Sequence, residues 1–310
     1  MKRTGLMAIL VAFIIGMVGC SGEGASSDSG EGITVQDARG EVTLDQLPER
    51  IVVMDFGALD TLKALGVGDK VVGIPQGGHV PKHLAEFQRE GVENVGSPKE
   101  PDMEAINRAK PDLVVVGGRQ KDFYEEISKA FTTMDVSYDA TTDAVTATTQ
   151  QAKMLGEATG TSDLVDQKVA EMEQAVEAKQ GALEGKTGLI VMTTGGKVTL
   201  HGPQSRFGLV HEVLGTEPAI ADISSDRHGQ PASFEAIAEA DPDYIFVVDR
   251  DSVVQSGGEN ARAVLDNELV NKTKAATENH MVYLDASRWY LTITGLENVP
   301  AMLEEASSVS

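Results

Sequence analysis

The stretch DMEAINRAKPDLVVVGGR at residues 102–119 decides the fold, because it recurs as SFEAIAEADPDYIFVVDR at residues 233–250. The two copies align without a gap at a constant offset of 131 residues. Each copy reads as a helix-capping residue, a short helix, a Pro-Asp break and an apolar strand that ends in arginine. A helix followed by a buried strand is the repeating half of a parallel sheet. We therefore expect an α/β fold with this unit in both halves of the chain.

Other apolar stretches extend the two halves into two Rossmann-like lobes with parallel sheets. Strands are expected in the first lobe at 51–54, 70–74 and 136–138, and in the second at 189–192, 197–200 and 281–284. Helices are expected at 59–65, 123–132, 207–214 and 295–304.

A helical connector is expected between the lobes. Residues 143–183 are rich in helix-forming residues, contain no proline and have one soft break at Gly160-Thr161-Ser162. They read as one long helix or as two stacked ones. The predicted boundaries are 33–141 for the N-terminal lobe, 142–185 for the connecting helix and 186–310 for the C-terminal lobe. Such a connector is a stiff hinge, so we expect small motions on ligand binding.

The first twenty residues have the pattern of a lipoprotein signal peptide. Lys2 and Arg3 precede an apolar run at 6–18, and the segment ends in Met17-Val18-Gly19-Cys20. The run is clearly shorter than the roughly 20 apolar residues of a membrane span. Cys20 is the only cysteine, and a lipid on its thiol is its natural use. We expect an exported protein, anchored to the membrane by Cys20 through a flexible tether at 21–32.

The chain is strongly acidic. Its formal net charge is −22, and removal of Lys2 and Arg3 with the signal leaves 24 basic against 48 acidic residues, or −24. Such a protein repels phosphate backbones, so we expect no nucleic-acid partner. An anionic ligand would need a local cluster of basic side chains.

Four stretches together give the chain a family resemblance. They are PERIVVMDFGALDTLKALGVGDKVVGI, VGSPKEPDMEAINRAKPDLVVVGGR, SFEAIAEADPDYIFVVDR and SRWYLTITG. The chain resembles the class III, helical-backbone solute-binding proteins of ABC importers, and within them the binders of ferric catecholate siderophores of the petrobactin and enterobactin type. The resemblance implies a monomer that captures a ferric siderophore between its lobes and passes it to a permease. It implies no intrinsic cofactor and no enzymatic activity.

The resemblance also implies which residues bind the ligand. Three arginines that contact catecholate oxygens in such proteins match Arg119, Arg206 and Arg250. A histidine and a tyrosine that can ligate the iron of the siderophore match His228 and Tyr290.

The chemistry of these residue types agrees with that role. Arg119 and Arg250 follow the strands of the two repeats, and open parallel sheets bind ligands at the carboxyl ends of their strands. Guanidinium groups suit an anionic, flat complex both as hydrogen-bond donors and as stacking planes. Histidine nitrogen and phenolate oxygen both suit ferric iron. Two alternatives without a role in ligand binding stay open. Arg250 could form a surface salt bridge with its neighbours Asp249 and Asp251, and Tyr290 could be a cleft aromatic that does not ligate iron.

Glu104 and Glu235 occupy the same place in the two repeats, early in a helix. Acids there complement the helix dipole. In the family that the chain resembles, one glutamate on each lobe docks with the permease, and a symmetric pair suits that role. Glu100 is the competing candidate on the first lobe.

Three other functions are alternatives. A zinc or manganese binder would use His79 and His83, which have the spacing of a helical ligand pair, but Pro81 puts His79 outside the helix. Haem or cobalamin would be a different cargo within the same family. An enzyme is disfavoured, because Gly195-Gly196-Lys197 lacks both the upstream glycine and the following Ser or Thr of a phosphate loop.

Overall fold

The computed structural model describes residues 32–139, 141–223, 228–254 and 260–308. Residues 32–310 form one compact unit. The predicted signal peptide, the lipidation site Cys20 and nearly all of the predicted tether lie outside the described residues. No described helix is long and apolar enough to cross a membrane.

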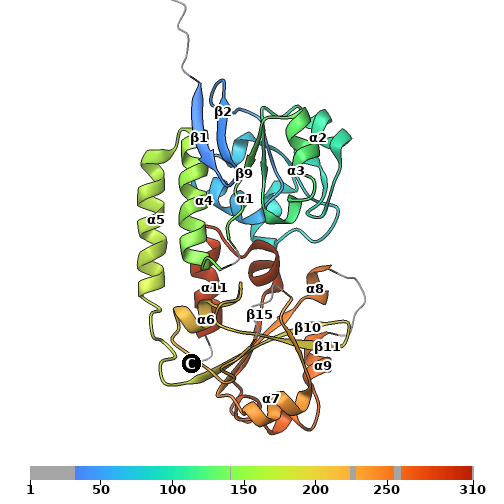
Figure 1. Cartoon of the computed structure of the whole chain (residues 1–310), viewed down its shortest axis with the longest axis vertical. Coiled ribbons are helices and arrows are strands. Elements are labelled where there is room, and N and C mark those ends of the chain that lie inside the picture. The colour runs from blue at the N-terminus through green and yellow to red at the C-terminus, as the bar shows by residue number, and fades with distance from the viewer. Residues whose placement is uncertain (1–31, 140, 224–227, 255–259, 309–310) are drawn as a thin grey trace, which may run out of the picture. The chain divides into compact units, whose positions relative to one another are not determined.

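The first lobe is built on a five-stranded parallel sheet (Figure 1). Its order is β5 (Glu93–Asn94), β4 (Val71–Ile74), β3 (Ile51–Val53), β8 (Leu113–Val116) and β9 (Thr133–Asp135). The helices of this lobe are α1 (Phe56–Ala64), α2 (Met103–Ala109), α3 (Tyr124–Ala130) and the 3₁₀ turns η1 (Gly68–Lys70), η2 (Lys82–Phe87) and η3 (Gly118–Gln120). Two small hairpins pair β1 (Ile33–Asp37) with β2 (Gly40–Leu44), and β6 (Gly96–Ser97) with β7 (Glu100–Pro101).

The strand expected at 136–138 is wrong by three residues, because β9 ends at Asp135. Aspartate is unfavourable in β-strands, so the sequence pattern does not predict a strand that ends in Asp135. In the structure Arg39 Nε lies 2.6 Å from the buried Asp135 carboxylate and compensates its charge.

The second lobe has a six-stranded mixed sheet of order β13-β11-β10-β14-β15, with β12 also paired to β10. These strands are β10 (Thr187–Thr194), β11 (Lys197–His201), β12 (Glu217–Pro218), β13 (Gln230–Ala232), β14 (Tyr244–Asp249) and β15 (Met281–Leu284). The helices are α6 (Leu209–Glu212), α7 (Phe234–Ala240), α8 (Asp251–Val254), α9 (Ala261–Leu265), η4 (Val270–Lys272), α10 (Lys274–Thr277), the π-turn η5 (Ser287–Thr292) and α11 (Asn298–Ser307).

The second sheet departs from the parallel arrangement at one edge, where β11 and β13 run antiparallel. The cause is the tight turn Gly195-Gly196, whose φ angles of 55° and 73° suit a two-residue hairpin. This is the segment that superficially resembles a phosphate loop. The strands β10, β14 and β15 are parallel, so the α/β class is confirmed.

The two sequence repeats form the same structure. In the first, Asp102 caps α2 by accepting a hydrogen bond from the Ala105 N–H, 3.0 Å away. In the second, Ser233 caps α7 in the same way through the Ala236 N–H, at 3.4 Å. Both helices end in a left-handed residue, Lys110 or Asp241, before the strands β8 and β14. The duplication is therefore real at the level of backbone geometry.

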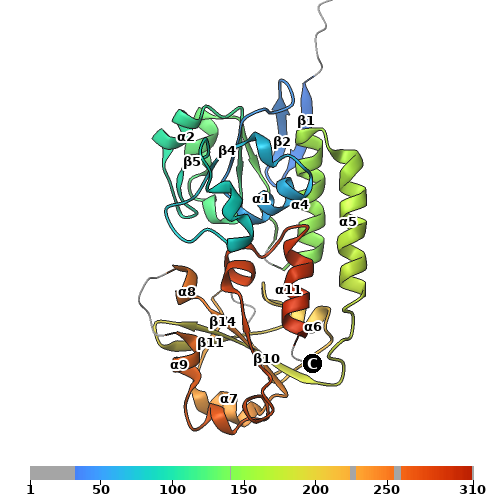
Figure 2. The same cartoon turned by 180° about the vertical axis from the view of Figure 1, so that it is seen from behind.

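The connector is two helices rather than one. α4 (Ala144–Thr159) ends at Gly160, whose φ of 70° allows the chain to reverse, and α5 (Ser162–Glu177) returns beside it. Figures 1 and 2 both show the two helices side by side. α4 packs on α1 and β1, whereas α5 packs on α11. One apolar cluster runs through both lobes and the connector and includes Leu59 of α1, Leu155 of α4 and Leu303 of α11.

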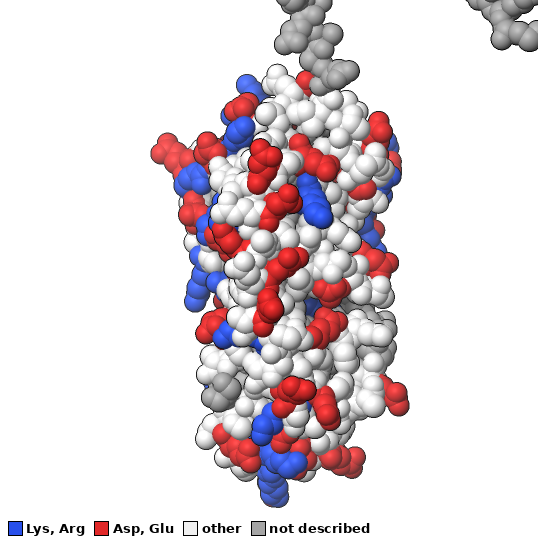
Figure 3. All heavy atoms as spheres, turned by 90° about the vertical axis from the view of Figure 1, so that its left-hand side faces the viewer, with Lys and Arg blue, Asp and Glu red and all other residues white. Residues whose placement is uncertain are grey.

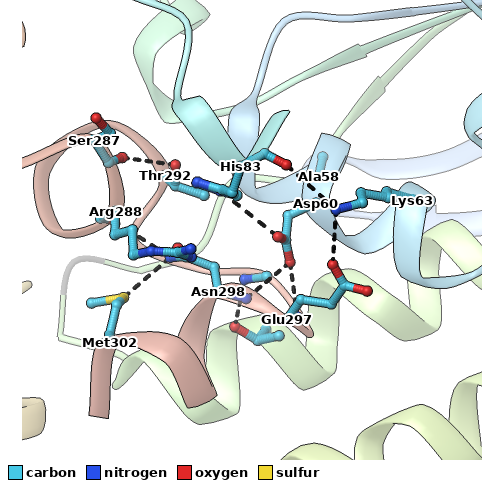
Figure 4. A network of polar contacts seen from close by, with 12 residues as sticks. Ala58, Asp60, Lys63, His83, Ser287, Arg288, Thr292, Glu297, Asn298 and Met302 are labelled. Carbon is cyan, nitrogen blue, oxygen red and sulfur yellow. Dashed lines mark hydrogen bonds and ion pairs between the residues drawn. The ribbon is translucent and has the colours of Figure 1, made fainter. Parts of the chain in front are cut away.

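A buried carboxylate joins the first lobe to the start of α11. Asp60 of α1 is fully buried, and its Oδ2 accepts hydrogen bonds from the Glu297 N–H at 2.9 Å and the Asn298 N–H at 3.1 Å (Figure 4). Those N–H groups belong to the first turn of α11 and have no partner within the helix. A Cβ on Gly295 would lie 2.4 Å from Asp60 Oδ2, so only glycine permits this approach.

The ring of His83 lies against the same carboxylate. Its Nε2 is 3.8 Å from Asp60 Oδ1, and neither atom has a hydrogen-bond partner among the described residues. Burial raises the pKa of Asp60 to about 6. Burial, and then the charge of Arg288, lowers the pKa of His83 to about 4. At neutral pH the aspartate is therefore charged and the histidine is neutral.

We expect Asp60 and His83 to affect stability with opposite dependence on pH. The pKa of Asp60 is raised in the folded state, so its carboxyl disfavours folding increasingly as the pH rises from about 4 to about 6. The pKa of His83 is lowered, so its ring favours folding increasingly as the pH rises from about 4 to about 6.5. As the pH rises through this interval, the free energy of unfolding of Asp60→Asn should increase by about 3 kcal/mol relative to that of the unaltered protein. The free energy of unfolding of His83→Gln should decrease by about 3 kcal/mol on the same comparison.

Urea unfolding of the three proteins at about pH 4 and about pH 7 measures these differences. A stability difference that is the same at both pH values for either variant would contradict the assignment.

Candidate functional site

Three arginines surround one tyrosine between the lobes. Arg119 lies in η3 directly after β8, Arg250 directly follows β14, and Arg206 comes from the segment after β11. Their guanidinium carbons lie 5.2, 5.6 and 4.7 Å from the centre of the Tyr290 ring, respectively. These distances are within the range of cation–π attraction. We call these four residues the arginine–tyrosine cluster.

Hydrogen bonds fix the two symmetric arginines on the tyrosine. Arg250 Nε donates to the Tyr290 hydroxyl at 2.9 Å, and Arg119 Nη2 donates to the Tyr290 backbone carbonyl. Tyr290 lies in η5 and is only 6% exposed. Arg119 and Arg250, which the repeat predicts to face each other across the cleft, thus meet on one residue. Sequence reasoning anticipated the meeting of these side chains but not that Tyr290 mediates it.

The cluster carries an excess of positive charge. Burial by itself would raise the pKa of Tyr290, but the Arg250 hydrogen bond and the charges of Arg206, Arg119 and Arg250 hold that pKa below its ordinary value. The site therefore stabilises a negatively charged oxygen. An anionic aromatic ligand would meet the same environment.

The carboxylates next to Arg250 have other partners. Asp249 accepts hydrogen bonds from the Ser252 and Ala261 N–H groups. Asp251 accepts one from the Gly195 N–H and lies 3.9 Å from Arg250 Nη1, at the limit of an ion pair. The alternative of an ordinary surface salt bridge therefore accounts poorly for Arg250.

The structure does not join His228 to the cluster. His228 is exposed in a turn that follows residues 224–227, which are not described. The contacts that define the cluster join Tyr290 to Arg119, Arg206 and Arg250 and do not include His228.

The two histidines of the free-metal alternative contact different residues. His79 Nε2 lies 2.9 Å from the Ser287 hydroxyl, whereas His83 faces Asp60. The described residues contain no group of three or more His, Cys, Asp or Glu side chains placed to hold a metal ion. η2 begins at Lys82, so His79 lies before the helix, as Pro81 predicts.

A pocket of about 170 Å³ adjoins the cluster. Arg119 and Arg206 form part of its wall, and the segment 291–294 forms another part. Three carboxylates, Asp55, Asp143 and Glu212, also line it. Sequence reasoning missed all three. Asp55 could have been found, because it follows β3 as Arg119 follows β8.

Burial raises the pKa of Asp55, while its hydrogen bond from the Ala58 N–H and the charge of Arg119 oppose that rise. A Cβ on Gly117 would lie 2.5 Å from Asp55 Oδ2, so a glycine is needed where the strand end meets this carboxylate.

Glu104 and Glu235 lie on the surface at equivalent places. Both are exposed in the first turns of α2 and α7, on different lobes (Figures 1 and 2). Glu100, the competing candidate, is exposed in β7. The geometry is compatible with docking by either residue on the first lobe.

On the surface over the connector, acidic side chains are more frequent than basic ones (Figure 3). Exposed acids of α5 contribute to it, namely Asp163, Asp166, Glu171, Glu173 and Glu177. The positive charge of the arginine–tyrosine cluster is thus set in an acidic protein, as its composition predicts.

Comparisons with known proteins agree with this geometry. The periplasmic binding protein family matches residues 51–287. The petrobactin-binding protein YclQ of Bacillus subtilis is 34% identical over 98% of each chain. Its crystal structure superposes with a TM-score of 0.83 at 33% identity, covering 90% of this chain and 98% of that one.

Two other solved structures are comparably similar. The periplasmic catecholate-siderophore binding protein VctP of Vibrio cholerae has a TM-score of 0.81 at 32% identity, over 90% of this chain and 100% of that one. The siderophore-binding protein BauB, bound to two molecules of acinetobactin and ferric iron, has a TM-score of 0.81 at 30% identity, over 90% and 98%.

Proposed function

Because the chain belongs to the periplasmic binding protein family, we propose that it captures a ferric catecholate-type siderophore between its lobes and delivers it to an ABC importer for iron uptake. Membership of this family also confirms the expectation that the protein is not an enzyme. The iron arrives with the siderophore as cargo, and we propose no intrinsic cofactor.

The arginine–tyrosine cluster is the observation that carries this proposal. Three guanidinium groups converge on one aromatic ring whose oxygen accepts a hydrogen bond from Arg250. A catecholate has the same elements, an aromatic face and negatively charged oxygens at its edge. Guanidinium groups can donate to those oxygens and stack on the ring at the same time. The names of YclQ, VctP and BauB, which describe siderophore binders, support the same cargo class.

Haem, cobalamin and free divalent metals fit the site less well. The cluster has three cationic donors and one phenol, too few ligands to hold a free metal ion, and an anionic cargo would gain most from three guanidinium charges. Cobalamin and haem present large apolar rings and fewer anionic oxygens for their area.

The cargo can be tested with the fluorescence of Trp289, the only tryptophan, which is buried next to Tyr290. Titration with ferric catecholates, ferric hydroxamates, haem and cobalamin should quench it most strongly with the catecholates. Arg119→Gln and Arg250→Gln should each weaken catecholate binding by about tenfold or more, since each removes a charged hydrogen-bond donor. Arg262→Gln is the matched control, because Arg262 lies 3.8 Å over the Tyr283 ring in the same kind of contact but is not part of the cluster.

Absence of quenching by every iron complex would refute the proposed cargo. A loss with Arg262→Gln equal to that with Arg250→Gln would refute the role of the cluster.

We further propose that Tyr290 and His228 ligate the iron of tetradentate siderophores. Such ligands leave two positions of an octahedral ferric ion open, and the lowered pKa of Tyr290 favours a phenolate ligand. Tyr290→Phe and His228→Ala should weaken ferric tetradentate complexes at least about tenfold more than hexadentate ones. Isothermal titration with a bis-catecholate and a tris-catecholate measures this ratio, with Tyr283→Phe as control. Equal losses for both classes would leave Tyr290 as a positioning residue only.

Glu104 and Glu235 are proposed to dock the two lobes on the permease of the importer, with the protein as a monomer held to the outer face of the membrane by a lipid on Cys20. Reversing both charges with Glu104→Lys and Glu235→Lys should leave ligand affinity unchanged and reduce ferric siderophore uptake by cells about tenfold or more, because like charges would meet at the interface. Glu239→Lys, an exposed change on α7, is the control. Normal uptake by the double variant would refute this docking pair and leave Glu100 as the candidate on the first lobe.

A further inference from the structure

The residue that follows each of the two symmetric arginines is buried. Gln120 follows Arg119, and Asp251 follows Arg250 at the same place in the second repeat. Gln120 is fully buried, and Asp251 is only 3% exposed. Buried polar side chains need hydrogen-bond partners, and a buried charge needs them most. The partners of Gln120 and Asp251 therefore show what each residue does at the end of its strand.

Gln120 uses both ends of its amide within the first lobe. Its Oε1 accepts a hydrogen bond from the Gly117 N–H at 2.9 Å. Its Nε2 donates to the carbonyls of Met54 and Pro98. These contacts join the end of β8 to the end of β3 and to the β6–β7 hairpin. Gln120 is thus neutral and satisfied, and it fixes the backbone that carries Arg119.

Asp251 uses only one of its two oxygens in this way. Its Oδ2 accepts a hydrogen bond from the Gly195 N–H, in the tight turn between β10 and β11. Its Oδ1 is buried and has no hydrogen-bond partner among the described residues. Arg250 Nη1 lies 3.9 Å from this Oδ1. A buried carboxylate oxygen without a hydrogen bond costs free energy, so its presence needs an explanation.

Arg250 can reach Asp251 through a small movement of its side chain. The backbone of Arg250 is fixed, since its N–H donates to the Thr193 carbonyl and its carbonyl accepts from the Val253 and Val254 N–H groups. A charged N–H···O hydrogen bond is about 2.8 Å long, so a shift of about 1 Å would bring Nη1 into hydrogen-bond contact with Oδ1. The side chain of Arg250 is 20% exposed, so it is not locked by packing on every side.

The Tyr290 hydroxyl is the present partner of Arg250, at 2.9 Å from Nε. The anionic oxygens of a catecholate would compete with this hydroxyl for the same guanidinium. A guanidinium has five N–H donors in a fixed fork, so Nη1 can bond to Asp251 while the other N–H groups face a cargo. A carboxylate behind the fork would then fix its orientation.

We infer that Asp251 is a positioning residue for Arg250: its unpartnered oxygen accepts the guanidinium when a cargo displaces the Tyr290 hydroxyl. The inference rests on the proposed function and deepens it. It makes the two symmetric arginines different, because Arg119 stands beside the neutral Gln120 whereas Arg250 stands beside a carboxylate. Asp251 offsets part of the charge of Arg250, so Arg250 acts on a cargo mainly as an oriented hydrogen-bond donor.

Asp251→Asn separates positioning from charge. The asparagine oxygen can still accept the Gly195 N–H, and its amide NH₂ would then face Arg250 Nη1, donor against donor. Removal of a negative charge beside the site should by itself tighten the binding of an anion. Loss of positioning should weaken it. We expect the full chain with Asp251→Asn to bind the ferric complex of a synthetic tris-catecholate about tenfold more weakly, as measured by quenching of Trp289.

A double-mutant cycle shows whether this effect passes through Arg250. In the Arg250→Gln background, Asp251→Asn should change the affinity by less than about twofold, because the side chain that it positions is absent. A purely structural role in the β10–β11 turn would weaken binding equally in both backgrounds. Asp251→Ser, which is also uncharged and keeps an oxygen acceptor, should give the same result. Urea unfolding checks that each variant is folded.

Asp249→Asn is the matched control. It removes the same charge from the other neighbour of Arg250, but the oxygens of Asp249 already accept hydrogen bonds from the Ser252 and Ala261 N–H groups. This variant should bind the tris-catecholate complex as tightly as the unaltered protein or more tightly.

The outcomes separate this inference from the function on which it rests. Undiminished binding by Asp251→Asn, or equal losses in both backgrounds, would overturn the positioning role and leave the proposed function standing. A loss with Asp249→Asn equal to that with Asp251→Asn would also overturn it. Failure of the unaltered protein to bind any ferric catecholate would overturn the proposed cargo, and the inference with it.

Discussion

The carboxylate of Asp60 accepts hydrogen bonds from the first N–H groups of α11, and the position of the proposed ligand site depends on this interaction. Asp60 belongs to the first lobe, whereas α11 follows the segment that carries Tyr290. The segment between η5 and α11 lies against α1, since a Cβ at Gly57 would meet Thr294 Oγ1 at 2.0 Å and a Cβ at Gly295 would meet Asp60 Oδ2 at 2.4 Å. A buried carboxylate that loses hydration must be compensated by hydrogen bonds, and the start of α11 supplies two of them. Tyr290, which lies in η5 just before α11, therefore has a defined place relative to the first lobe.

Tyr290 solves a problem that the proposed ligand creates. Three guanidinium groups in one cleft repel one another, and without a partner their side chains would spread into solvent. The Tyr290 hydroxyl, carbonyl and ring face give them favourable contacts while the cleft is empty. The arginines are thus arranged before the ligand arrives, which reduces the entropy lost on binding. One apolar cluster runs through both lobes and the connector, so we expect small lobe movements on binding.

The sequence predicted what periodicity and repetition encode, and it missed what depends on contacts between distant residues. The repeat correctly located α2 with β8 and α7 with β14, because caps, turns and buried strands are local patterns. β9 was misplaced because Asp135 is tolerated through Arg39, far away in the chain. The antiparallel β11 depends on the turn conformation of Gly195-Gly196, which apolar patterning does not report.

The difference between local patterns and contacts of distant residues also applies to the proposed binding site. Arg119, Arg250 and Tyr290 were predicted from the family resemblance, and the structure brings them together, whereas no local signal joins Asp143 to Glu212. No local sequence pattern predicts that Asp143 and Glu212 line one pocket. Asp60 was missed for the same reason, since a buried acid inside an apolar helix is explained only by the N–H groups of α11.

The repeat supplies Arg119 and Arg250, which follow the strands β8 and β14 of the two sheets. Segments outside the repeated unit supply Arg206, Tyr290, Asp143 and Glu212. The repeated residues are held by strand pairing, so their positions are fixed by the same hydrogen bonds that form the lobes. The residues outside the repeat lie in turns and at helix ends, where a substitution leaves the sheets intact. Under the proposed function, affinity for an anionic ligand depends on residues held by the scaffold, and the choice among such ligands depends on side chains that can change independently. This separation explains how one fold can serve siderophores of different shape, since only the second set of residues has to differ.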